Sequence, residues 1–456
     1  MNKIAKRTWA ALALAGVLLL GLLIIVVRYM VDSPDWVTFQ NSPHVYTDGV
    51  MNSGRIVDRS GTLLLDATNG KTYAESGTLR RAMLHLLGDR EGNIPAFLLA
   101  KYGDELIGFD RFNGTYSTGE REGRMELTLS AEAQKAALNA LDGRKGTVGV
   151  YNYKTGEILC MVSSPTFDPD DVPDVAGNPE AYDGVYVNRF LYGDYTPGSI
   201  FKLVTAAAAL EQIPDIEQRS FFCEGSAQVG AETVICNGVH GEQDFQSALA
   251  NSCNVAFAEI AAELGPDTLT EYVRKTGILS RLSFDGTKTA AGSFDLTGAT
   301  TYEAAWAGVG QYTDQINPCQ YMTYMGAIAN GGQAAVPYLV QNVYFGDSRK
   351  YSASTSKCDR ALDEDTADRL AEMMHYTVQN VYGDWYFSGL YAGAKSGTAE
   401  VGNGEPANAL FAGFVQDEDY PLAFVVVVEK GGGGASTCAP IISQVLDACI
   451  TSMNME

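Results

Sequence analysis

The feature that most constrains this chain is an uninterrupted apolar segment near its amino terminus. Residues Thr8 to Val27 carry no charge and are mostly apolar, and a helix of about 20 such residues spans a bilayer. The flanking charges are Lys3, Lys6 and Arg7 before the segment and Asp32 and Asp35 after Arg28. Because the more basic flank of a membrane span stays inside the cell, we expect the amino terminus in the cytoplasm and everything after Arg28 outside it.

A cleaved signal peptide is the alternative for this segment. The apolar run is longer than a usual signal-peptide core, no Ala-x-Ala-like site follows it, and no cysteine follows it to accept a lipid. No second span is predicted. We therefore expect a single-pass protein of the cell membrane, with a cytoplasmic tail (1–7), a transmembrane helix (8–28) and an extracytoplasmic remainder.

Charge and metal-binding residues exclude several classes of protein. The formal net charge of −23 argues against a nucleic-acid partner. The eight cysteines form no disulfide framework and no zinc pattern, and the four histidines (His44, His85, His240 and His375) lack ligand spacing. We therefore expect no metal and no zinc hydrolase, and a Ser-His-Asp triad is disfavoured. Cys223 and Cys236 flank a glycine-bearing stretch that could form a hairpin, so a disulfide between them stays open; the other cysteines are expected to be small buried side chains.

The 456 residues suffice for two or three domains, and we divide the extracytoplasmic part into two. Residues 29–126 are predicted to form a small non-catalytic pedestal, with a helix over Leu79–Leu87 and a β-like run over Gly54–Leu64 that turns at Ser60-Gly61. A larger domain, 127–456, begins with a helix that Ser130 caps and a hairpin over Thr147–Ser163.

The pattern of helix-like and strand-like segments in the rest of the larger domain predicts how this domain is built. Helices dominate from Ser199 to Asn330, and β-like runs return at Leu390–Val401, Ala409–Val415 and Ala423–Glu429 before a helix over Ala439–Ile450. The four consecutive valines of the third run are typical of a strand covered on both faces. Strands at both ends with helices between them indicate one α/β (α+β) sheet assembled from distant segments and covered by helices.

A serine and a lysine stand where a long apolar helix is predicted to begin. Thr196 is expected to cap this helix and Pro197 to occupy its first position. Ser199 and Lys202 are three apart and would share a face. The apolar, alanine-rich run Leu203–Leu210 predicts a buried helix, so Lys202 is expected to have a lowered pKa. A snorkelling lysine beside a capping serine is the alternative.

Three short motifs follow one another along the larger domain. They are Ser199-Ile200-Phe201-Lys202, Ser252-Cys253-Asn254 and Lys395-Ser396-Gly397-Thr398. Each pattern also occurs elsewhere, at Ser354–Lys357, Ser452–Asn454 and Lys154–Gly156. Taken singly, each motif is also compatible with a turn cap, a loop hydroxyl or a surface lysine. Only the first set gives the order Ser-x-x-Lys, Ser-x-Asn, Lys-Ser/Thr-Gly in suitable contexts, and it therefore predicts one active site.

With these motifs the sequence resembles the class B penicillin-binding proteins, membrane-anchored serine transpeptidases of bacterial cell-wall synthesis. Further matching landmarks are Asn188-Arg189, Tyr195–Ser199, Ser163–Pro169, His240-Gly241, Gly310-Gln311, Ala329–Gly332 and, in the pedestal, Gly54–Gly61. Tyr312 departs from the family, which usually has glycine there, and we expect a local loop change. The resemblance implies the penicillin-binding serine transpeptidase fold, with an antiparallel sheet covered by helices.

The resemblance also implies a role for each motif residue. Ser199 would attack the carbonyl between two D-alanines of a stem peptide, with a neutral Lys202 as its base. Ser252 and Asn254, in an extended loop, would relay the leaving-group proton and hold the peptide amide. Lys395 would support this network by its charge. The remaining implied roles are carboxylate binding by the Ser396 and Thr398 hydroxyls, close substrate approach at Gly397, and an oxyanion hole from the Ser199 and Thr398 N–H groups.

The resemblance implies an enzyme without a cofactor that takes stem peptides and β-lactams. The pedestal is too short for a glycosyltransferase domain, so the enzyme is expected to be monofunctional and to work beside a SEDS-family membrane glycan polymerase, with Thr8–Val27 and the pedestal as contact surface. Two alternatives stay open: a D,D-carboxypeptidase or β-lactamase that sends the acyl-enzyme to water, and a membrane-anchored β-lactam sensor or inactive peptide-binding module.

Overall fold

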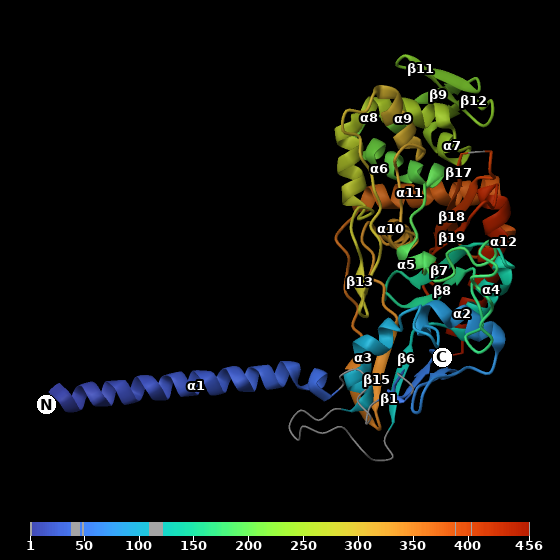
Figure 1. The fold of residues 1–456 in the computed structure, drawn as a ribbon. Coiled ribbons are helices and arrows are strands. Elements are labelled where there is room, and N and C mark those ends of the chain that lie inside the picture. Colours follow the sequence, from blue (N-terminus) through green and yellow to red (C-terminus); the bar gives the residue numbers. More distant parts are fainter. Residues whose placement is uncertain are drawn as a thin grey trace.

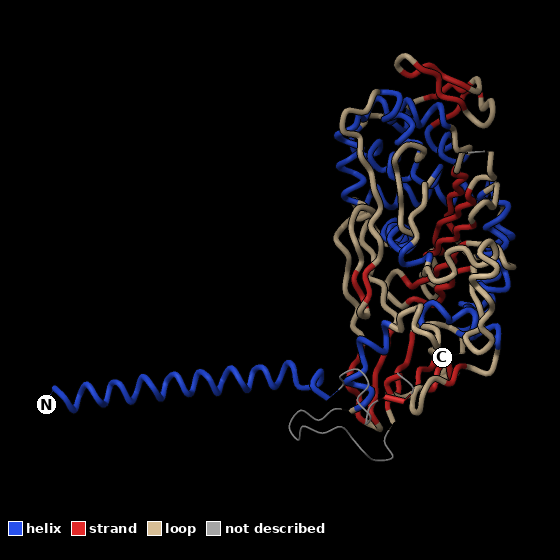
Figure 2. The backbone as a smooth tube through the Cα atoms, viewed as in Figure 1, coloured by secondary structure: helices blue, strands red, loops and turns tan. Residues whose placement is uncertain are grey.

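A computed structural model describes residues 2–37, 46–47, 50–108, 122–387, 389–402 and 404–455 (Figures 1 and 2). The first element is the helix α1 (Asn2–Val37), which projects away from the rest of the chain. Within it, Lys3–Ser33 is apolar and long enough to cross a membrane, and the apolar side chains of this stretch are exposed. The predicted helix at Thr8–Val27 is therefore present, with the exposed apolar surface that a membrane span requires.

A five-stranded antiparallel sheet forms the centre of the larger domain. Its strands, in spatial order, are β17 (Ala392–Ala399), β18 (Asn408–Val415), β19 (Leu422–Val428), β7 (Gly146–Asn152) and β8 (Ile158–Ser164). The predicted hairpin is β7–β8, and the three predicted late strands are β17, β18 and β19. The order confirms that distant segments assemble one sheet, because β19, the last strand of this sheet in sequence order, pairs with β7, the first.

Helices cover both faces of this sheet (Figure 1). Alternate residues of each central strand enter two separate hydrophobic clusters: Phe411 and Val426 pack in one, while Ala412 and Val425 pack in the other. The first face is covered by α4 (Ala131–Leu141) and α12 (Gly434–Met453), and the second by α10 (Pro318–Ala329) and α11 (Glu364–Thr377). Burial on both faces explains the four consecutive valines, and Ser130 caps α4 as predicted.

The helical region predicted between Ser199 and Asn330 lies beyond the second face. It consists of α6 (Lys202–Gln212), α7 (Phe245–Ala250), α8 (Asn254–Lys275) and α9 (Thr301–Val309), and α10 ends it. Two two-stranded sheets accompany these helices: β9 (Ser220–Cys223) with β12 (Gly241–Asp244), and the hairpin of β10 (Ser226–Val229) with β11 (Glu232–Ile235). A second short hairpin consists of β13 (Ser283–Phe284) and β14 (Thr287–Lys288), and the short helix α5 (Arg189–Tyr192) precedes the region.

A second sheet occupies the amino-terminal part of the molecule. Its order is β16 (Ser348–Ser352), β15 (Val340–Phe345), β6 (Gly123–Leu127), β3 (Arg55–Val57), β4 (Leu63–Asp66) and β5 (Thr72–Tyr73). The helices α2 (Gly77–Leu87) and α3 (Phe97–Ile107) accompany it, and β1 (Tyr46–Thr47) pairs with β2 (Val50–Met51). The predicted β-like run thus becomes β3 and β4, and the predicted helix becomes α2. Sequence order did not indicate that two strands from within residues 127–456 would complete this sheet.

Candidate active site

Ser199 lies in a 3-10 turn, Gly198–Phe201, which immediately precedes α6. The prediction that Thr196 caps the helix is wrong. The Thr196 hydroxyl accepts a hydrogen bond from Gln315 Nε2 at 3.0 Å, and the turn has no side-chain cap. Gly198 has a φ of +56°, a left-handed conformation that favours glycine, so a regular helix cannot begin at Pro197.

Hydrogen bonds from neighbouring helices hold this turn in place. The Tyr321 hydroxyl of α10 donates to the Ile200 carbonyl at 2.7 Å, and the Thr205 hydroxyl of α6 donates to the Gly308 carbonyl at 2.7 Å. The α6 side chains from Lys202 through Ala209 are all buried. The predicted buried helix is therefore present, and Lys202, at its first position, is 0% exposed.

The Lys202 amine connects the first two sequence motifs. Lys202 Nζ lies 3.1 Å from Ser199 Oγ, 3.2 Å from Ser252 Oγ and 2.7 Å from Asn254 Oδ1. It also donates to the Ser252 carbonyl at 2.6 Å. A snorkelling lysine would place its amine in water, so full burial of Lys202 excludes that alternative.

The third motif meets the others through Lys395. Its strand β17 is the edge strand of the central sheet, yet Lys395 is 0% exposed. Lys395 Nζ donates to Ser252 Oγ at 3.0 Å and to the Ser396 carbonyl at 3.1 Å. Ser252 Oγ therefore lies between two lysine amines, and residues far apart in sequence form one hydrogen-bonded group.

Burial changes the protonation of both lysines. Removal from water lowers the pKa of Lys202 to about 7, because burial disfavours the charged form. Burial also lowers the pKa of Lys395 far below its ordinary value, and the nearby Lys202 adds to that shift. A neutral Lys202 is thus accessible near neutral pH. The same shift counts against a permanently charged Lys395, the form that the sequence had suggested.

The prediction that Ser252–Asn254 forms an extended loop is wrong, because this motif forms the tight turn at which α8 begins. Ser252 has a φ of +55°, and Asn254 is the first residue of α8. The Cys253 sulfur between them caps α8 by accepting from Ala256 N. Both motif side chains nevertheless reach Lys202, because its Nζ lies 3.2 Å from the Ser252 hydroxyl and 2.7 Å from the Asn254 side-chain amide oxygen.

The outer part of β17 packs against the nucleophile turn. A Cβ built at Gly397 would lie 2.5 Å from the Pro197 carbonyl oxygen, and one built at Gly198 would lie 2.8 Å from that of Thr398. The close approach that Gly397 permits is therefore made by the chain's own backbone. This packing places Gly198, the residue before Ser199, against the backbone of Thr398; an oxyanion hole from the Ser199 and Thr398 N–H groups stays a prediction.

The structure adds two residues that motif analysis did not assign. The Tyr382 hydroxyl accepts from Ser396 N at 2.9 Å and shares a second 2.9 Å hydrogen bond with Ser396 Oγ. Gln311 Nε2 donates to the Thr398 carbonyl at 3.1 Å, and the Thr398 hydroxyl accepts from Gly434 N at 3.3 Å. Gln311 was visible as a family landmark, whereas Tyr382 belongs to no motif and is identified only by its contacts.

The chance copies of the motifs lie elsewhere in the fold. Ser354–Lys357 follows β16 of the amino-terminal sheet, Lys154–Gly156 forms the turn between β7 and β8, and Ser452–Asn454 ends α12. Tyr312, which departs from the family pattern, is partly exposed, and its hydroxyl donates to Glu303 at 3.1 Å.

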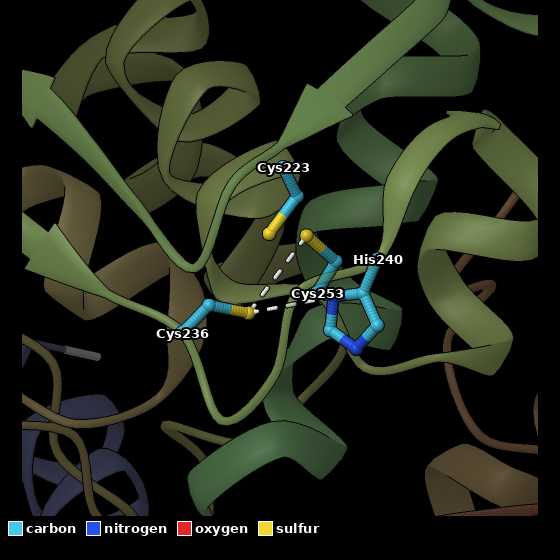
Figure 3. A group of neighbouring side chains, drawn as sticks. All are labelled: Cys223, Cys236, His240 and Cys253. Carbon is cyan, nitrogen blue, oxygen red and sulfur yellow. Dashed lines mark hydrogen bonds between the residues drawn. The ribbon is translucent and has the colours of Figure 1, made fainter.

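The cysteines and histidines require a correction. Cys223 and Cys236 are free thiols, although the hairpin predicted between them is present as β10–β11. The sequence predicts no metal ligands, but the fold brings together Cys223, Cys236, His240 and Cys253, whose potential ligand atoms all lie within 4.8 Å of one another (Figure 3). Cys236 and His240 share the loop between β11 and β12, whereas Cys223 ends β9 and Cys253 caps α8, so sequence spacing alone did not reveal the group.

Comparison with known proteins relates the chain to transpeptidases. The family model described as "Penicillin binding protein transpeptidase domain" matches residues 146–447. Stage V sporulation protein D of Bacillus subtilis is 29% identical over an alignment of 355 residues, and the match covers 73% of this chain and 54% of that protein. The peptidoglycan D,D-transpeptidase PbpA of Mycolicibacterium smegmatis is 29% identical over an alignment of 376 residues, and the match covers 74% of this chain and 75% of that protein. The chain thus spans about half of the first relative and three quarters of the second.

Solved structures share the fold. The D,D-transpeptidase domain of a peptidoglycan glycosyltransferase from Eggerthella lenta has a TM-score of 0.75 and 28% identity, and the match covers 89% of this chain and 99% of that one. A ceftriaxone acyl-enzyme complex of penicillin-binding protein A from M. tuberculosis has a TM-score of 0.75 at 23% identity, covering 87% of this chain and 98% of that one. The predicted fold class is therefore confirmed.

Proposed function

The chain belongs to the penicillin-binding protein transpeptidase family, and we propose that it is a serine D,D-transpeptidase that cross-links peptidoglycan stem peptides. One observation carries this proposal: Lys202 Nζ lies within hydrogen-bond distance of Ser199 Oγ, Ser252 Oγ and Asn254 Oδ1, and Lys395 Nζ reaches the same Ser252 hydroxyl. An amine that is buried beside a serine hydroxyl and has a lowered pKa can accept the proton that makes the serine a nucleophile.

The distances around Lys202 suggest where its lone pair points. A neutral amine has two N–H bonds, and the two shortest contacts, to the Ser252 carbonyl at 2.6 Å and to Asn254 Oδ1 at 2.7 Å, take them. The lone pair is then left for the Ser199 hydroxyl at 3.1 Å, which donates its proton as its oxygen attacks. A second lysine beside the first raises the cost of holding both charged, which favours the neutral base.

Acylation follows from this arrangement. Ser199 Oγ forms a bond to the carbonyl carbon between two D-alanines, and the bond to the terminal D-alanine nitrogen breaks. The proton taken by Lys202 reaches that leaving nitrogen through the Ser252 hydroxyl, which lies between the two lysines. The N–H groups of Ser199 and Thr398 stabilise the oxyanion, a contribution of about 2.7–4 kcal/mol per donor in related chemistry.

The second half of the reaction decides the class of enzyme. In a transpeptidase an amine of a second stem peptide attacks the acyl-enzyme, whereas in a D,D-carboxypeptidase or β-lactamase water does so. The membrane helix and the amino-terminal sheet favour synthesis. A β-lactam fits the same reaction, because its strained amide takes the place of the D-alanyl-D-alanine bond.

The membrane anchor suggests the setting of the enzyme. We propose that α1 crosses the cell membrane with its amino terminus in the cytoplasm and that the catalytic domain acts outside. The enzyme carries no glycosyltransferase activity and works beside a SEDS-family polymerase, which contacts α1 and the pedestal. Exchange of Thr8–Val27 for an unrelated membrane helix should reduce co-purification with the polymerase; unchanged co-purification would count against this interface.

Labelling with a fluorescent penicillin tests the enzymatic proposal. We expect the full-length protein to take up the label covalently, and both Ser199→Ala and Lys202→Ala to lose it. Ser354→Ala, which alters the chance copy of the first motif, is the matched control and should label normally. A folded wild-type protein that takes no label would overturn the proposal, and rapid release of the label would favour a β-lactamase.

A further inference from the structure

Four side chains with metal-binding atoms converge beside the Ser252–Asn254 motif (Figure 3). Cys223 ends β9, Cys236 follows β11, His240 precedes β12, and Cys253 caps α8. Cys223 and Cys253 are 0% exposed, and Cys236 is 9% exposed. Their sulfur atoms and a His240 ring nitrogen all lie within 4.8 Å of one another.

The distances from Cys236 Sγ to Cys253 Sγ and to His240 Nδ1 match the edges of a metal tetrahedron. Zinc binds thiolate sulfur at about 2.3 Å and imidazole nitrogen at about 2.0–2.1 Å, so tetrahedral geometry requires S···S edges of about 3.8 Å and S···N edges of about 3.6 Å. The Cys236 and Cys253 sulfurs are 3.9 Å apart, and Cys236 Sγ lies 3.6 Å from His240 Nδ1. Three thiols in such proximity, all free, leave a central position that a cation can fill.

The surroundings also favour thiolates. Backbone N–H groups point at two of the sulfurs: Asn254 N donates to Cys236 Sγ at 3.2 Å, and Ala256 N donates to Cys253 Sγ at 3.5 Å. Hydrogen bonds to ligand sulfurs are typical of the outer shell of metal sites.

We propose that Cys223, Cys236, His240 and Cys253 form a structural zinc site. Three soft thiolates and one imidazole in tetrahedral arrangement select zinc over magnesium, calcium or manganese. Four protein ligands leave no position for water, so the ion holds chain segments together and takes no part in the reaction. This proposal does not depend on the transpeptidase activity.

The site has a consequence for the motif that it adjoins. Cys253 separates Ser252 from Asn254, and the Asn254 side-chain amide donates to the Ile235 carbonyl at 3.1 Å and to Asn237 Oδ1 at 3.2 Å. A metal ion would therefore fix the β10–β11 hairpin to the start of α8. The positions of Ser252 and Asn254 relative to Lys202 would depend on that link, an effect that does rest on the proposed function.

Metal analysis of the purified full-length protein in detergent tests the site. We expect about one zinc ion per chain, and substitution by Co²⁺ should produce the visible absorption of a tetrahedral thiolate complex. Cys223→Ser and His240→Ala should bind zinc at least about tenfold more weakly. Cys358→Ser changes a cysteine outside the group and should retain full zinc content.

Two results would overturn the proposal. One is a wild-type protein that contains no zinc and takes up neither zinc nor Co²⁺ after reduction. The other is a non-reducing peptide map in which two of Cys223, Cys236 and Cys253 are joined by a disulfide, since an oxidised pair cannot supply two thiolates. Both results come from wild-type protein, so they stand even if a variant fails to fold.

A separate measurement tests whether the metal ion affects the Ser252–Asn254 motif. Removal of zinc by a chelator should slow acylation by a fluorescent penicillin at least about tenfold, and added zinc should restore the rate. If zinc is lost without a change in the acylation rate, the proposed effect on the motif is wrong, but the proposal of a metal site still stands. Wild-type protein that holds zinc but is never acylated would instead contradict the proposed enzyme.

Discussion

At the scale of single residues, the decisive feature is the surroundings of Lys202. Four oxygen atoms lie within hydrogen-bond distance of its amine, and none of them belongs to a carboxylate. Burial disfavours the protonated form and outweighs the opposing charge effect of Cys236 and Cys253. A side chain that is ordinarily charged at neutral pH is therefore available here in its uncharged form.

The first prediction concerns pH. Because the pKa of Lys202 is lowered to about 7 and only its neutral form can accept the Ser199 proton, acylation should accelerate as pH rises and level off above about 8. At pH 6 about a tenth of the amine is neutral, so the rate should be about tenfold below the plateau. Second-order rate constants for a fluorescent penicillin, measured between about pH 5 and 9, check this. Circular dichroism over the same range verifies folding, and a flat profile would contradict the assignment of the base.

The second prediction concerns Tyr382, a positioning residue for the β17 edge. Tyr382→Phe removes the acceptor of Ser396 N and the partner of its hydroxyl. Loss of such a hydrogen bond costs about 1 kcal/mol, so acylation should slow about fivefold with little change in pH profile. Acylation kinetics provide the measurement. Tyr376→Phe in α11 is the matched control, and equal rates for Tyr382→Phe and wild type would show that the contact has no role in positioning.

At the scale of elements, helix α2 connects the amino-terminal part to the catalytic domain. Arg80 Nε and Nη2 donate to the two carboxylate oxygens of Asp168 at 2.7 and 2.6 Å, and both side chains are mostly buried. Nearby, Leu84 packs in a small cluster with Phe167 and Val185. The segment after β8 is therefore held by α2 through both charge and apolar contacts.

The third prediction follows from that contact. Arg80→Ala leaves the Asp168 carboxylate without its bidentate partner, and hydrogen bonds to charged groups contribute about 1.5–3 kcal/mol. We expect the free energy of unfolding to fall by about that amount, measured by denaturant titration. Lys135→Ala breaks the exposed pair with Glu132 and should cost no more than about 0.5 kcal/mol. Equal effects of the two substitutions would contradict a specific role for Arg80.

At the scale of the whole molecule, the amino-terminal sheet is built from strands that lie far apart in the sequence. Strand β6 lies between β3, with which it is parallel, and β15, with which it is antiparallel. Strands β15 and β16 come from residues 340–352, more than two hundred positions after β6. The catalytic domain therefore cannot be separated from the pedestal by a single cut at residue 127 without leaving β15 unpaired on one side.

The fourth prediction tests this interdependence. Deletion of residues 1–37 removes α1 and should give a protein that leaves the membrane fraction and is still acylated by penicillin. Deletion of residues 1–126 should give an aggregated product, because it exposes the edge of β15. Solubility and penicillin labelling of the two proteins provide the comparison. A soluble, fully reactive product from the longer deletion would show that the catalytic domain folds without the amino-terminal sheet.

The sequence alone was sufficient for the apolar amino-terminal helix, the central strands and the three motifs, because these depend on local patterns. An apolar run of fixed length, four consecutive valines and a serine three residues before a lysine are visible without the fold. The order and context of the motifs excluded their chance copies. The sequence did not indicate the hydrogen bonds of Thr196 with Gln315 or of Tyr382 with Ser396, because the partners lie at other places in the chain.

Only the tertiary structure decided the features that depend on contact between distant segments. It buried the side chain of Lys395 although β17 is an edge strand. It gave Ser252 a left-handed backbone conformation just before α8, and it completed the pedestal sheet with β15 and β16. It also gathered Cys223, Cys236, His240 and Cys253, which sequence spacing had left scattered. The physical reason is the same in each case: burial, electrostatics and metal geometry act over distances of a few ångströms in space, whereas a sequence pattern records only neighbours along the chain.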